Sequence, residues 1–541
     1  MGSTDRRTVI GGAREAQGYW RLTAGPGEAH RTRTELVSGA GKASPGRALL
    51  SIGQLSDLHL CDTQSPARAE FLDRWADDDS PVKEQVQAVG TYRAQELLTV
   101  QVAEAMVRAL NDVGAGPVGG AALDWAIVTG DITDNAQSNE VGWALRLLEG
   151  GPIVPDSGDP GRYEGVAAAD EYFDEAYWHP EAAAGSVDRP HRLHGFPDAP
   201  GLLEAVRLPF DASGLSMPWL AVHGNHDQMI QGTIPAGDVR DFSFAGLAAR
   251  KVIGLPDHWS HETIAQFCQD VDECRIDALR VWDSLPSRPI TVDLARETVS
   301  RTEFIAAHFG SAARPMGHGF DSSARQTGRA YYRFDHGPVT VLALDTVNEH
   351  GGWEGSLDVE QFEWLDRELT AADRERRYVV LASHHPLARL INPRLPDGAG
   401  ADRRILADEL SAALQRHPSL VLWVNGHTHR STVTPHFAVA GGTGWWEVTA
   451  PSLIDFPQQA RIIELLRSDS SVLTIASTML DHAGSLPWAG GVRSVVEMAG
   501  LSRELAANDW QWRTDDLSRH GRAGSPADRN VLLPLPDPFP R

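Results

Sequence analysis

The sequence predicts an α/β fold with two sheets, and three observations support this prediction. Five short aliphatic runs have the length of strands, and each ends in a cluster of polar side chains. Segments with apolar residues at helical spacing lie between some of these runs. Three further strand-like runs follow the last cluster and predict a second sheet packed on the first. We therefore expect buried strands whose polar residues gather at one edge of a sheet.

The strands are predicted in chain order from apolar runs that lack the wide polar face of a surface helix. Those that end in polar clusters are residues 47–52, 125–128, 219–222, 378–381 and 420–424. A sixth run, residues 339–344, ends at Asp345-Thr346 without a clear ligand. Those expected in the second sheet are residues 445–449, 460–466 and 472–477. Helical spacing predicts helices at residues 99–110 and 361–369 and, in pieces, at 263–281.

The domain organisation follows from the uneven intervals between the polar clusters. The longest interval separates Asn225 from His384. Stretches rich in Gly and Pro, at residues 155–164 and 190–200, predict surface loops. We expect one domain with inserts around its site and an extension at each end. The predicted boundaries are 1–45 for the N-terminal extension, 46–480 for the domain, about 141–215 and 229–335 for its inserts, and 481–541 for the C-terminal extension.

Composition disfavours several classes of protein. Of 541 residues, 42% are hydrophobic and 23% charged, as in ordinary folded soluble proteins. The formal net charge of -24 would repel nucleic-acid phosphates, so no nucleic-acid partner is expected. The three cysteines, Cys61, Cys268 and Cys274, form neither a disulfide framework nor paired zinc knuckles. No apolar run reaches about 18 residues, so no membrane-spanning helix is expected.

The N-terminal residues bear on the location of the protein. Arg6-Arg7 could begin a twin-arginine signal, but Arg14, Glu15 and Gln17 interrupt any apolar part of an export signal. As written, the chain is expected in the cytoplasm. The alternative is an exported protein from which a twin-arginine leader has been removed.

The polar clusters contain residue types that bind metal ions. Asp57 and His59 are separated by one residue, so on an extended backbone both side chains point to the same side. The same argument brings His427 and His429 to a common centre. Asp131 follows Gly130 at a tight turn, and its two carboxylate oxygens make it the candidate to bridge two ions.

Two further residues complete the predicted ligand set. Asn225 offers a neutral carbonyl oxygen, and His384 a further imidazole. The formal charge of two divalent cations exceeds the combined negative charge of Asp57, Asp131 and a bridging hydroxide. The net charge of the predicted centre is therefore positive. Nitrogen and oxygen ligands without sulfur suit manganese, iron or zinc, and disfavour copper(I) or an iron–sulfur cluster. A phosphate ester would be attracted to such a centre despite the acidic surface.

Each motif has an ordinary structural interpretation when it is taken alone. An Asp-X-His triplet means little in a chain with 21 histidines, and Gly130-Asp131 is common in turns. Residues 224–227 also resemble a hairpin turn. Gly426-His427-Thr428-His429 is the most specific single element. Five such motifs in order, each after a predicted strand, favour one shared site.

The ordered set Asp-X-His, Gly-Asp-X-X-Asp, Gly-Asn-His-Asp, His-X-Pro and Gly-His-X-His resembles the calcineurin-like metallophosphoesterase family over 57–429. The long inserts are similar to those of a bacterial subfamily in which twin-arginine signals are common. The resemblance implies a four-layer α-β-β-α sandwich of two mixed sheets and two divalent or mixed-valence ions of Mn, Fe or Zn. It implies Asp57, His59, Asp131 and His429 as ligands of the first metal, and Asp131, Asn225, His384 and His427 as ligands of the second.

The resemblance also implies roles for residues next to the ligands. His226 would lie unligated near the leaving group and protonate it, with Asp227 orienting its ring. Asp134 and Asn135 would buttress the Asp131 turn. His385 is the alternative ligand to His384, although the His-X-Pro spacing favours His384. Ser383 stands where the family often has Gly, a departure that should not disturb ligation.

The function expected from the resemblance is hydrolysis of a phosphomonoester or phosphodiester by a metal-bridging hydroxide. A small-molecule substrate, such as a nucleotide or a glycerophosphodiester, is expected. The alternative is a catalytically inactive scaffold of the same fold that binds proteins. A nuclease is disfavoured because no dense basic cluster lies beside the motifs. Trp445 and Trp446 are general candidates for substrate contact, although core positions are favoured for both.

Overall fold

A computed structural model describes residues 2–37, 46–86, 90–182, 186–234, 246–275, 280–310, 312–396, 403–438, 444–468 and 471–540. Its first large sheet is mixed and has the strand order β4-β20-β19-β18-β5-β6-β9, with β1 paired to β19. The three strands β5, β6 and β9 are parallel neighbours. Their bounds are Arg47–Leu55 for β5, Trp125–Thr129 for β6, Trp219–Val222 for β9, Gln459–Arg467 for β18, Val472–Asp481 for β19, Val531–Pro536 for β20, Arg31–Thr32 for β4 and Gly2–Ser3 for β1.

The second large sheet is also mixed and has the order β12-β13-β14-β15-β17-β16. Its central strands β13, β14, β15 and β17 are parallel, and the two edge strands are antiparallel to their neighbours. The bounds are Tyr332–His336 for β12, Val339–Ala343 for β13, Tyr378–Ala382 for β14, Leu420–Asn425 for β15, Thr432–His436 for β16 and Trp445–Thr449 for β17.

The distribution of strands between the sheets differs from the prediction. The three runs after the last motif do not form the second sheet together, because β17 lies beside β15 whereas β18 and β19 extend the sheet of β5. The five strands that precede the polar clusters are likewise divided. β5, β6 and β9 belong to the first sheet, and β14 and β15 to the second. An apolar run specifies a buried strand but not its neighbour, which long-range packing decides.

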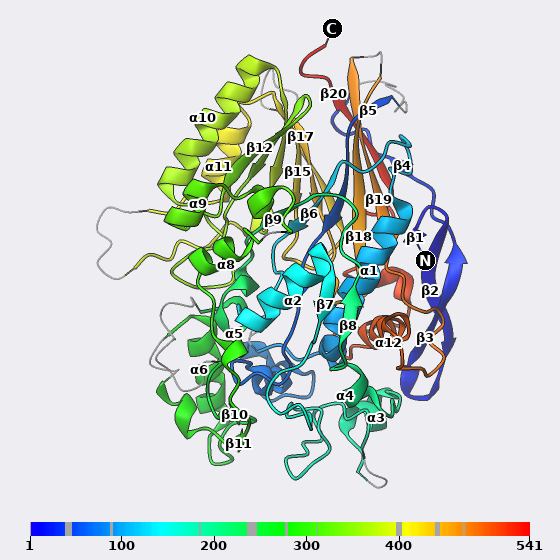
Figure 1. The fold of residues 1–541 in the computed structure, drawn as a ribbon, viewed down its shortest axis with the longest axis vertical. Coiled ribbons are helices and arrows are strands. Elements are labelled where there is room, and N and C mark those ends of the chain that lie inside the picture. The colour runs from blue at the N-terminus through cyan, green and yellow to red at the C-terminus, as the bar shows by residue number, and fades with distance from the viewer. Residues whose placement is uncertain are drawn as a thin grey trace.

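The two sheets share one apolar core. Ile52 and Val128 of the first sheet belong to the same buried cluster as Val341 and Val424 of the second. Side chains alternate along each strand, so the other face of β13 carries Leu342, which packs with α10 (Val359–Glu375) and α11 (Ala407–Leu414). Figure 1 shows α10 and α11 along the outer side of this sheet and α1 (Thr99–Val113) beside the other.

The predicted helices are found in their predicted places. α1 covers residues 99–110 and α10 covers 361–369, with the Asp358 side chain accepting a hydrogen bond from the backbone N–H of Gln361 at the start of α10. The segment 263–281 contains α6 (His261–Asp272), and its residues 276–279 lie outside the described part. One loop prediction is wrong, because 190–200 begins within α3 (Arg189–His194). A proline in the first turn favours such a helix start.

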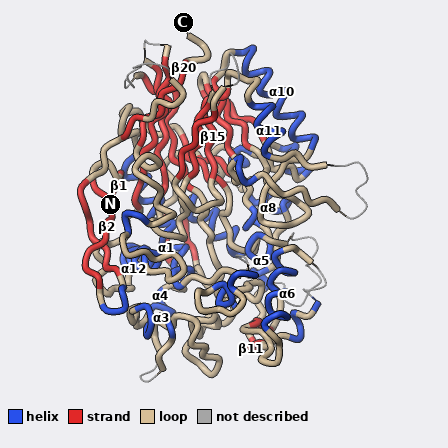
Figure 2. The backbone as a smooth tube through the Cα atoms, turned by 180° about the vertical axis from the view of Figure 1, so that it is seen from behind, coloured by secondary structure: helices blue, strands red, loops and turns tan. Residues whose placement is uncertain are grey.

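In Figure 1 most of the inserts lie below the strands, and Figure 2 shows the same region from behind. Residues 301–307 and 322–327 instead pack on the shared core, through Ile305 and Ala324. The elements of the inserts are β7 (Gly151–Ile153), α4 (Leu202–Ala205), β8 (Phe210–Ala212), α5 (Met229–Gly232), β10 (Arg250–Val252), β11 (Ser287–Pro289), α8 (Arg301–Ala307) and α9 (Ser322–Thr327). α2 (Ser138–Glu149) packs beside α1 at the start of the first insert. Among the described residues, none of the helices has the length and apolarity required to cross a bilayer.

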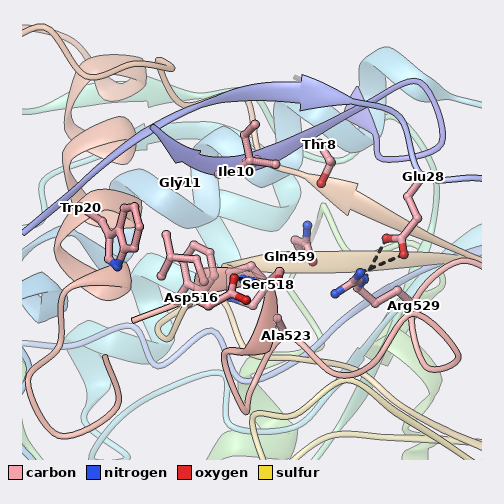
Figure 3. A pocket seen from close by; sticks show the side chains of 14 residues that line it. Thr8, Ile10, Gly11, Trp20, Glu28, Gln459, Asp516, Ser518, Ala523 and Arg529 are labelled. Atoms are coloured by element: carbon pink, nitrogen blue, oxygen red, sulfur yellow. Dashed lines mark hydrogen bonds and ion pairs between the residues drawn. The ribbon is translucent and has the colours of Figure 1, made fainter. Parts of the chain in front are cut away.

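The terminal segments pack against each other and against the first sheet. The predicted extensions 1–45 and 481–541 contribute β1, β4 and β20 to that sheet. The hairpin of β2 (Arg7–Arg14) and β3 (Trp20–Pro26) lies next to α12 (Val495–Ala507), which contacts β3. A cavity of about 350 Å³ lies between the hairpin and the C-terminal segment. Figure 3 shows its lining side chains, with Glu28 paired to Arg529. Both ends of the chain are therefore part of the folded structure.

Candidate metal centre

The predicted ligands follow the carboxyl ends of five strands, in tight loops with an unusual backbone. Positive φ angles occur at Asp57 (52°), His59 (45°), Asp131 (49°), His427 (67°) and His429 (54°). The prediction of an extended backbone at Asp57 and His59 is therefore wrong, although both side chains still reach one site. Left-handed conformations at residues other than glycine are strained and gather at functional sites, because the surrounding structure must hold them there.

Two glycines allow the motif loops to approach each other closely. A Cβ atom added at Gly130, where φ is +88°, would lie 2.5 Å from Nδ1 of His384. A Cβ atom at Gly224 would lie 2.1 Å from the backbone nitrogen of Asp131. Only glycine fits at such distances. The Gly-Asp and Gly-Asn-His-Asp motifs therefore require glycine because one loop packs closely on another at these positions.

The first group of ligand atoms comprises those of Asp57, His59, Asp131 and His429, all within 4.8 Å of one another and all buried. Nε2 of His59 lies 3.0 Å from Nε2 of His429 and 3.7 Å from Oδ2 of Asp131. Nε2 of His429 lies 3.3 Å from Oδ1 of Asp57. These four side chains are the ones that the resemblance assigns to the first metal.

The opposite ring nitrogens fix which nitrogen carries the proton. Nδ1 of His59 donates to Oδ1 of Asp134 at 3.2 Å, and Nδ1 of His429 donates to Oδ2 of Asp455 at 2.5 Å. Both Nε2 atoms therefore direct lone pairs at each other across 3.0 Å, an arrangement that favours a cation between them. Burial and the nearby His226 lower the pKa of His59 to about 4, so its ring stays neutral, as a metal ligand must be.

The second group is formed by His384, His427 and Asn225, with Asp131 beside them. Oδ1 of Asn225 lies 2.9 Å from Nε2 of His384 and 3.1 Å from Nδ1 of His427. Nδ1 of His384 donates to the carbonyl oxygen of Thr129 at 2.9 Å, so Nε2 faces the site. Burial lowers the pKa of His384, but the Asp131 carboxylate outweighs it and raises this pKa to about 9.

Asp131 lies between the two groups. Its Oδ2 atom is 3.7 Å from Nε2 of His59 and 3.1 Å from Nε2 of His384. Its Oδ1 atom accepts a hydrogen bond from the backbone N–H of His226 at 2.8 Å. One carboxylate therefore contacts ligands of both groups, which is the position required for a bridge.

His385 does not present a free ring nitrogen to the site. Its Nδ1 atom lies 2.8 Å from Oγ1 of Thr346, and its Nε2 atom lies 3.0 Å from the carbonyl oxygen of Trp353. Burial and His384 lower the pKa of His385 to about 3. Of the two alternatives left by the sequence, the geometry favours His384 as the ligand.

His226 lies beside the first group, with its side chain 17% exposed. Its ring meets that of His59 edge to face, with ring centroids 4.4 Å apart. The expected orienting role of Asp227 is not what the contacts show. Nδ1 of His226 lies 3.3 Å from Oδ1 of Asp134. Asp227 instead accepts hydrogen bonds from Thr133 and the backbone N–H of Gly224, and so fixes the loop.

The residues expected to buttress the Asp131 turn have wider contacts. Asp134 bonds to His59, contacts the ring of His226 and pairs with the buried Arg68. Oδ1 of Asn135 accepts a hydrogen bond from the backbone N–H of Gln231 at 2.8 Å. Asp134 thus connects a predicted metal ligand with the predicted proton donor.

The centre opens into a pocket of about 750 Å³. Asp131, Asn225, His226, His427 and His429 lie in its wall. Its other walls contain residues that the motifs did not indicate, including Arg93, Trp353, Arg389, Arg430, Trp512 and Arg522. Sequence reasoning also missed Asp455, the partner of His429. Arg93, Asp455, Trp512 and Arg522 come from parts of the chain distant from the motifs, whereas Arg389 and Arg430 lie close to them but belong to no metal-binding pattern. Trp445 and Trp446 are buried in the core, as favoured from the sequence.

The fold and the site together define an α/β protein with a candidate centre for two cations. No protein-family model and no curated protein matched the chain. Similar solved structures include a dimetal phosphatase from Danio rerio, at 11% identity and a TM-score of 0.32, with coverage of 80% of this chain and 99% of that one. Another is GAP50, the anchor in the inner membrane complex of Plasmodium, at 9% identity and a TM-score of 0.27, with coverage of 83% and 88%. At these identities and TM-scores, the likeness does not assign a function to this chain.

Proposed function

We propose that this chain is a binuclear, calcineurin-like metallophosphoesterase that hydrolyses a small-molecule phosphate ester, with two sheets and flanking helices forming a four-layer sandwich. The observation that carries the proposal is the pair of ligand groups joined by Asp131. In the first group, Nε2 of His59 and Nε2 of His429 face each other at 3.0 Å while Nδ1 of each ring is held by a carboxylate. In the second group, Nε2 of His384 faces Oδ1 of Asn225 at 2.9 Å while Nδ1 is held by the carbonyl oxygen of Thr129. Buried ligand atoms arranged in this way suit a bound cation better than direct contact with one another.

In the proposed assignment, Asp57, His59, Asp131 and His429 hold one cation, and Asp131, Asn225, His384 and His427 hold the other. The donor set of nitrogen and oxygen suits Mn, Fe or Zn. When bound, two such cations acidify a water molecule and stabilise negative charge on phosphoryl oxygens.

The other residues of the site act on the substrate or on the ligands. His226 is partly exposed at the pocket, where its imidazole can protonate the departing oxygen of the ester. Asp134 holds the ring through Nδ1, so that Nε2 is directed away from that carboxylate. Asp455 orients His429 through its Nδ1 atom. Through these contacts, each of the two imidazoles has one ring nitrogen held by a carboxylate and the other available for its proposed role.

The proposal is tested by a substrate panel on the full chain loaded with manganese. The panel contains p-nitrophenyl phosphate, bis-p-nitrophenyl phosphate and cyclic nucleotides, so it separates a monoesterase from a diesterase. We expect hydrolysis of at least one compound and its loss after treatment with a chelator. A chain that binds two manganese ions and hydrolyses none of the panel would favour the scaffold function instead.

A further inference from the structure

Three arginines gather on one side of the pocket, around a single carboxylate and a single indole ring. Nε of Arg93 lies 2.8 Å from Oδ1 of Asp455, and a guanidinium nitrogen of Arg522 pairs with Oδ2 of the same carboxylate. The guanidinium carbons of Arg522 and Arg430 lie 4.1 and 5.7 Å from the ring centroid of Trp512. All of these residues except Asp455 line the pocket. We name Arg93, Arg430 and Arg522 the arginine cluster.

Among the described residues, the ion pairs of the arginine cluster offer its three guanidinium groups two carboxylates, Asp455 and Glu96. The pKa of Asp509 is raised by burial, and the charge of Arg93 partly offsets this rise. Asp455 is one carboxylate for two arginines, and it also binds His429. Glu96 lies 3.5 Å from Arg93 but is held more closely, at 2.5 Å, by Arg68. Burial lowers the pKa of Arg522 well below its usual range, and the charges of Arg93 and Arg430 lower it further. Arg93 and Arg522 are buried, and like charges kept together in a buried position are stabilised by a nearby anion.

Other carboxylates in the pocket wall do not supply such an anion. Asp408 is exposed, on α11. Glu447 is engaged with His436 at 2.7 Å and with the backbone N–H of Leu387 at 2.8 Å. Asp131 belongs to the candidate metal centre. A cluster of three arginines beside a pocket is notable in a chain whose formal net charge is -24.

The arginine cluster is separate from the position of the scissile phosphate. Arg93 and Arg522 contact Asp455, which meets His429 at Nδ1. The metal-facing atom of His429 is Nε2, on the opposite side of the ring. The imidazole of His429 therefore separates Arg93 and Arg522 from the atoms that would hold the cations. Cations bound at the proposed centre would, with His226, balance the charge of a phosphoryl group there.

We propose that the arginine cluster binds a second anionic group of the substrate, a phosphate or carboxylate carried at a distance from the scissile phosphate. Guanidinium groups bind both anions through paired, charge-assisted hydrogen bonds. The cavity of about 750 Å³ has room for a substrate that spans the two positions. This inference rests on the proposed function. It narrows the substrate class to phosphate esters that carry a second anionic group besides the scissile phosphate.

Two matched substrate pairs test the inference for both ester classes. The diester pair is phenyl p-nitrophenyl phosphate and 4-carboxyphenyl p-nitrophenyl phosphate, which share one leaving group. The monoester pair is benzyl phosphate and 4-carboxybenzyl phosphate. On the manganese-loaded full chain, we expect the carboxylated member of the hydrolysed pair to have the higher kcat/KM, by about tenfold and mainly through KM.

The variant Arg430→Gln tests whether the arginine cluster causes this preference. Arg430 is exposed, so the substitution should leave the fold intact. We expect it to remove most of the preference by lowering kcat/KM for the carboxylated member, with a much smaller change for the member without the carboxylate. Arg519→Gln is the matched control, because Arg519 is exposed and does not line the pocket. Equal kcat/KM within the pair, or a preference that survives Arg430→Gln, would overturn the inference.

A binding measurement separates this inference from the proposed function. Sulfate is titrated calorimetrically into the full chain after removal of metal by a chelator. We expect sulfate to bind, and Arg430→Gln to weaken it by about tenfold. If the chain binds sulfate in this way but has no esterase activity, the missing activity refutes the proposed function, and the sulfate binding still supports the anion site. Sulfate binding that is absent, or insensitive to Arg430→Gln, would overturn the anion site even in an active enzyme.

Discussion

At the scale of single residues, the orientation of imidazole rings is what distinguishes a metal site from a polar cluster. His59, His384 and His429 each have one ring nitrogen held by a carboxylate or a carbonyl oxygen, and the other directed at the centre. Polar partners of this kind set the tautomer and the direction of the lone pair. His385 provides the contrast, because both of its ring nitrogens are engaged elsewhere.

The variant His226→Ala tests the proton donor. Because the ring is not among the proposed ligands, we expect both metals to be retained, with turnover lowered by about 10²–10⁴. Steady-state kinetics and elemental analysis on the same sample measure both quantities. Full activity in this variant would remove His226 from the mechanism.

The variant Asp131→Asn tests the bridge. An amide has one oxygen acceptor and no charge, so both ions should bind more weakly. Elemental analysis after dialysis against metal-free buffer is expected to show fewer than the wild-type number of ions per chain. Metal content equal to that of the wild type would contradict the bridging role.

The site ligands could be predicted from residue types and order, whereas their supporting residues could not. The motifs indicated Asp57, His59, Asp131, Asn225, His384, His427 and His429, and the structure brings these side chains together, although their metal-binding roles stay predictions. Asp455 and Trp512 could not be predicted, because a lone Asp or Trp has no pattern. The partner of His226 was expected to be the adjacent Asp227, but folding placed Asp134 closer to the ring.

At the scale of elements, the loops after the strands carry the strain of the site. Five predicted ligands have left-handed backbone, and neighbouring glycines remove the side chains that would keep the loops apart. Each such residue is destabilising by about 1–3 kcal/mol, so the rest of the fold must compensate. Buried strands on both sides of the loops supply that rigidity.

The variant Gly224→Ala tests the close approach of two motif loops. Its Cβ atom would lie 2.1 Å from the backbone nitrogen of Asp131, so we expect the free energy of unfolding to fall by about 1–3 kcal/mol or more. Urea unfolding measures this change. Gly142→Ala is the matched control, since a Cβ atom there meets no atom within 4 Å and lies in α2, where Ala is favoured over Gly by about 0.5–1 kcal/mol. Equal stability of both variants would contradict the packing argument.

The position of each strand in the sequence was easier to predict than which strands lie beside it in the sheet. The runs at 125–128 and 378–381 are strands because continuous aliphatic residues need burial on both faces. The runs at 445–449 and 460–466 look alike in sequence but belong to different sheets. Their separation depends on contacts with strands that come much earlier in the chain, and no local pattern encodes those contacts.

At the scale of the whole molecule, the site lies where the loops that follow the strands of the first sheet meet those that follow the strands of the second. Three predicted ligand loops come from the first sheet and two from the second. Assembly of the site therefore requires both sheets to be packed on their shared core. The second insert and the C-terminal segment complete the pocket wall, for example through Thr233, Trp512 and Arg522.

The stability of the molecule should depend on pH through its buried histidines, of which His308 lies outside the metal site. Burial lowers the pKa of His308 to about 3, against about 6.5 for an unfolded histidine. Its stabilising contribution is therefore present above pH 6.5 and is lost as the pH falls toward 3. Relative to wild type, His308→Gln should lose less stability on acidification between about pH 6 and pH 4, by up to about 1.4 kcal/mol per pH unit.

Urea unfolding at several pH values measures the two slopes. The matched control is His258→Gln, which removes an exposed imidazole. Parallel stability curves for wild type and His308→Gln would show that His308 binds the same number of protons in the folded and unfolded chains, against this prediction.

The most direct test of the central claim is anomalous X-ray diffraction from crystals of the manganese-loaded chain. The account predicts two peaks about 3.5–4 Å apart. One should lie among Asp57, His59 and His429, the other among Asn225, His384 and His427, with Asp131 between them. A single peak, or none within this group of side chains, would contradict the binuclear centre.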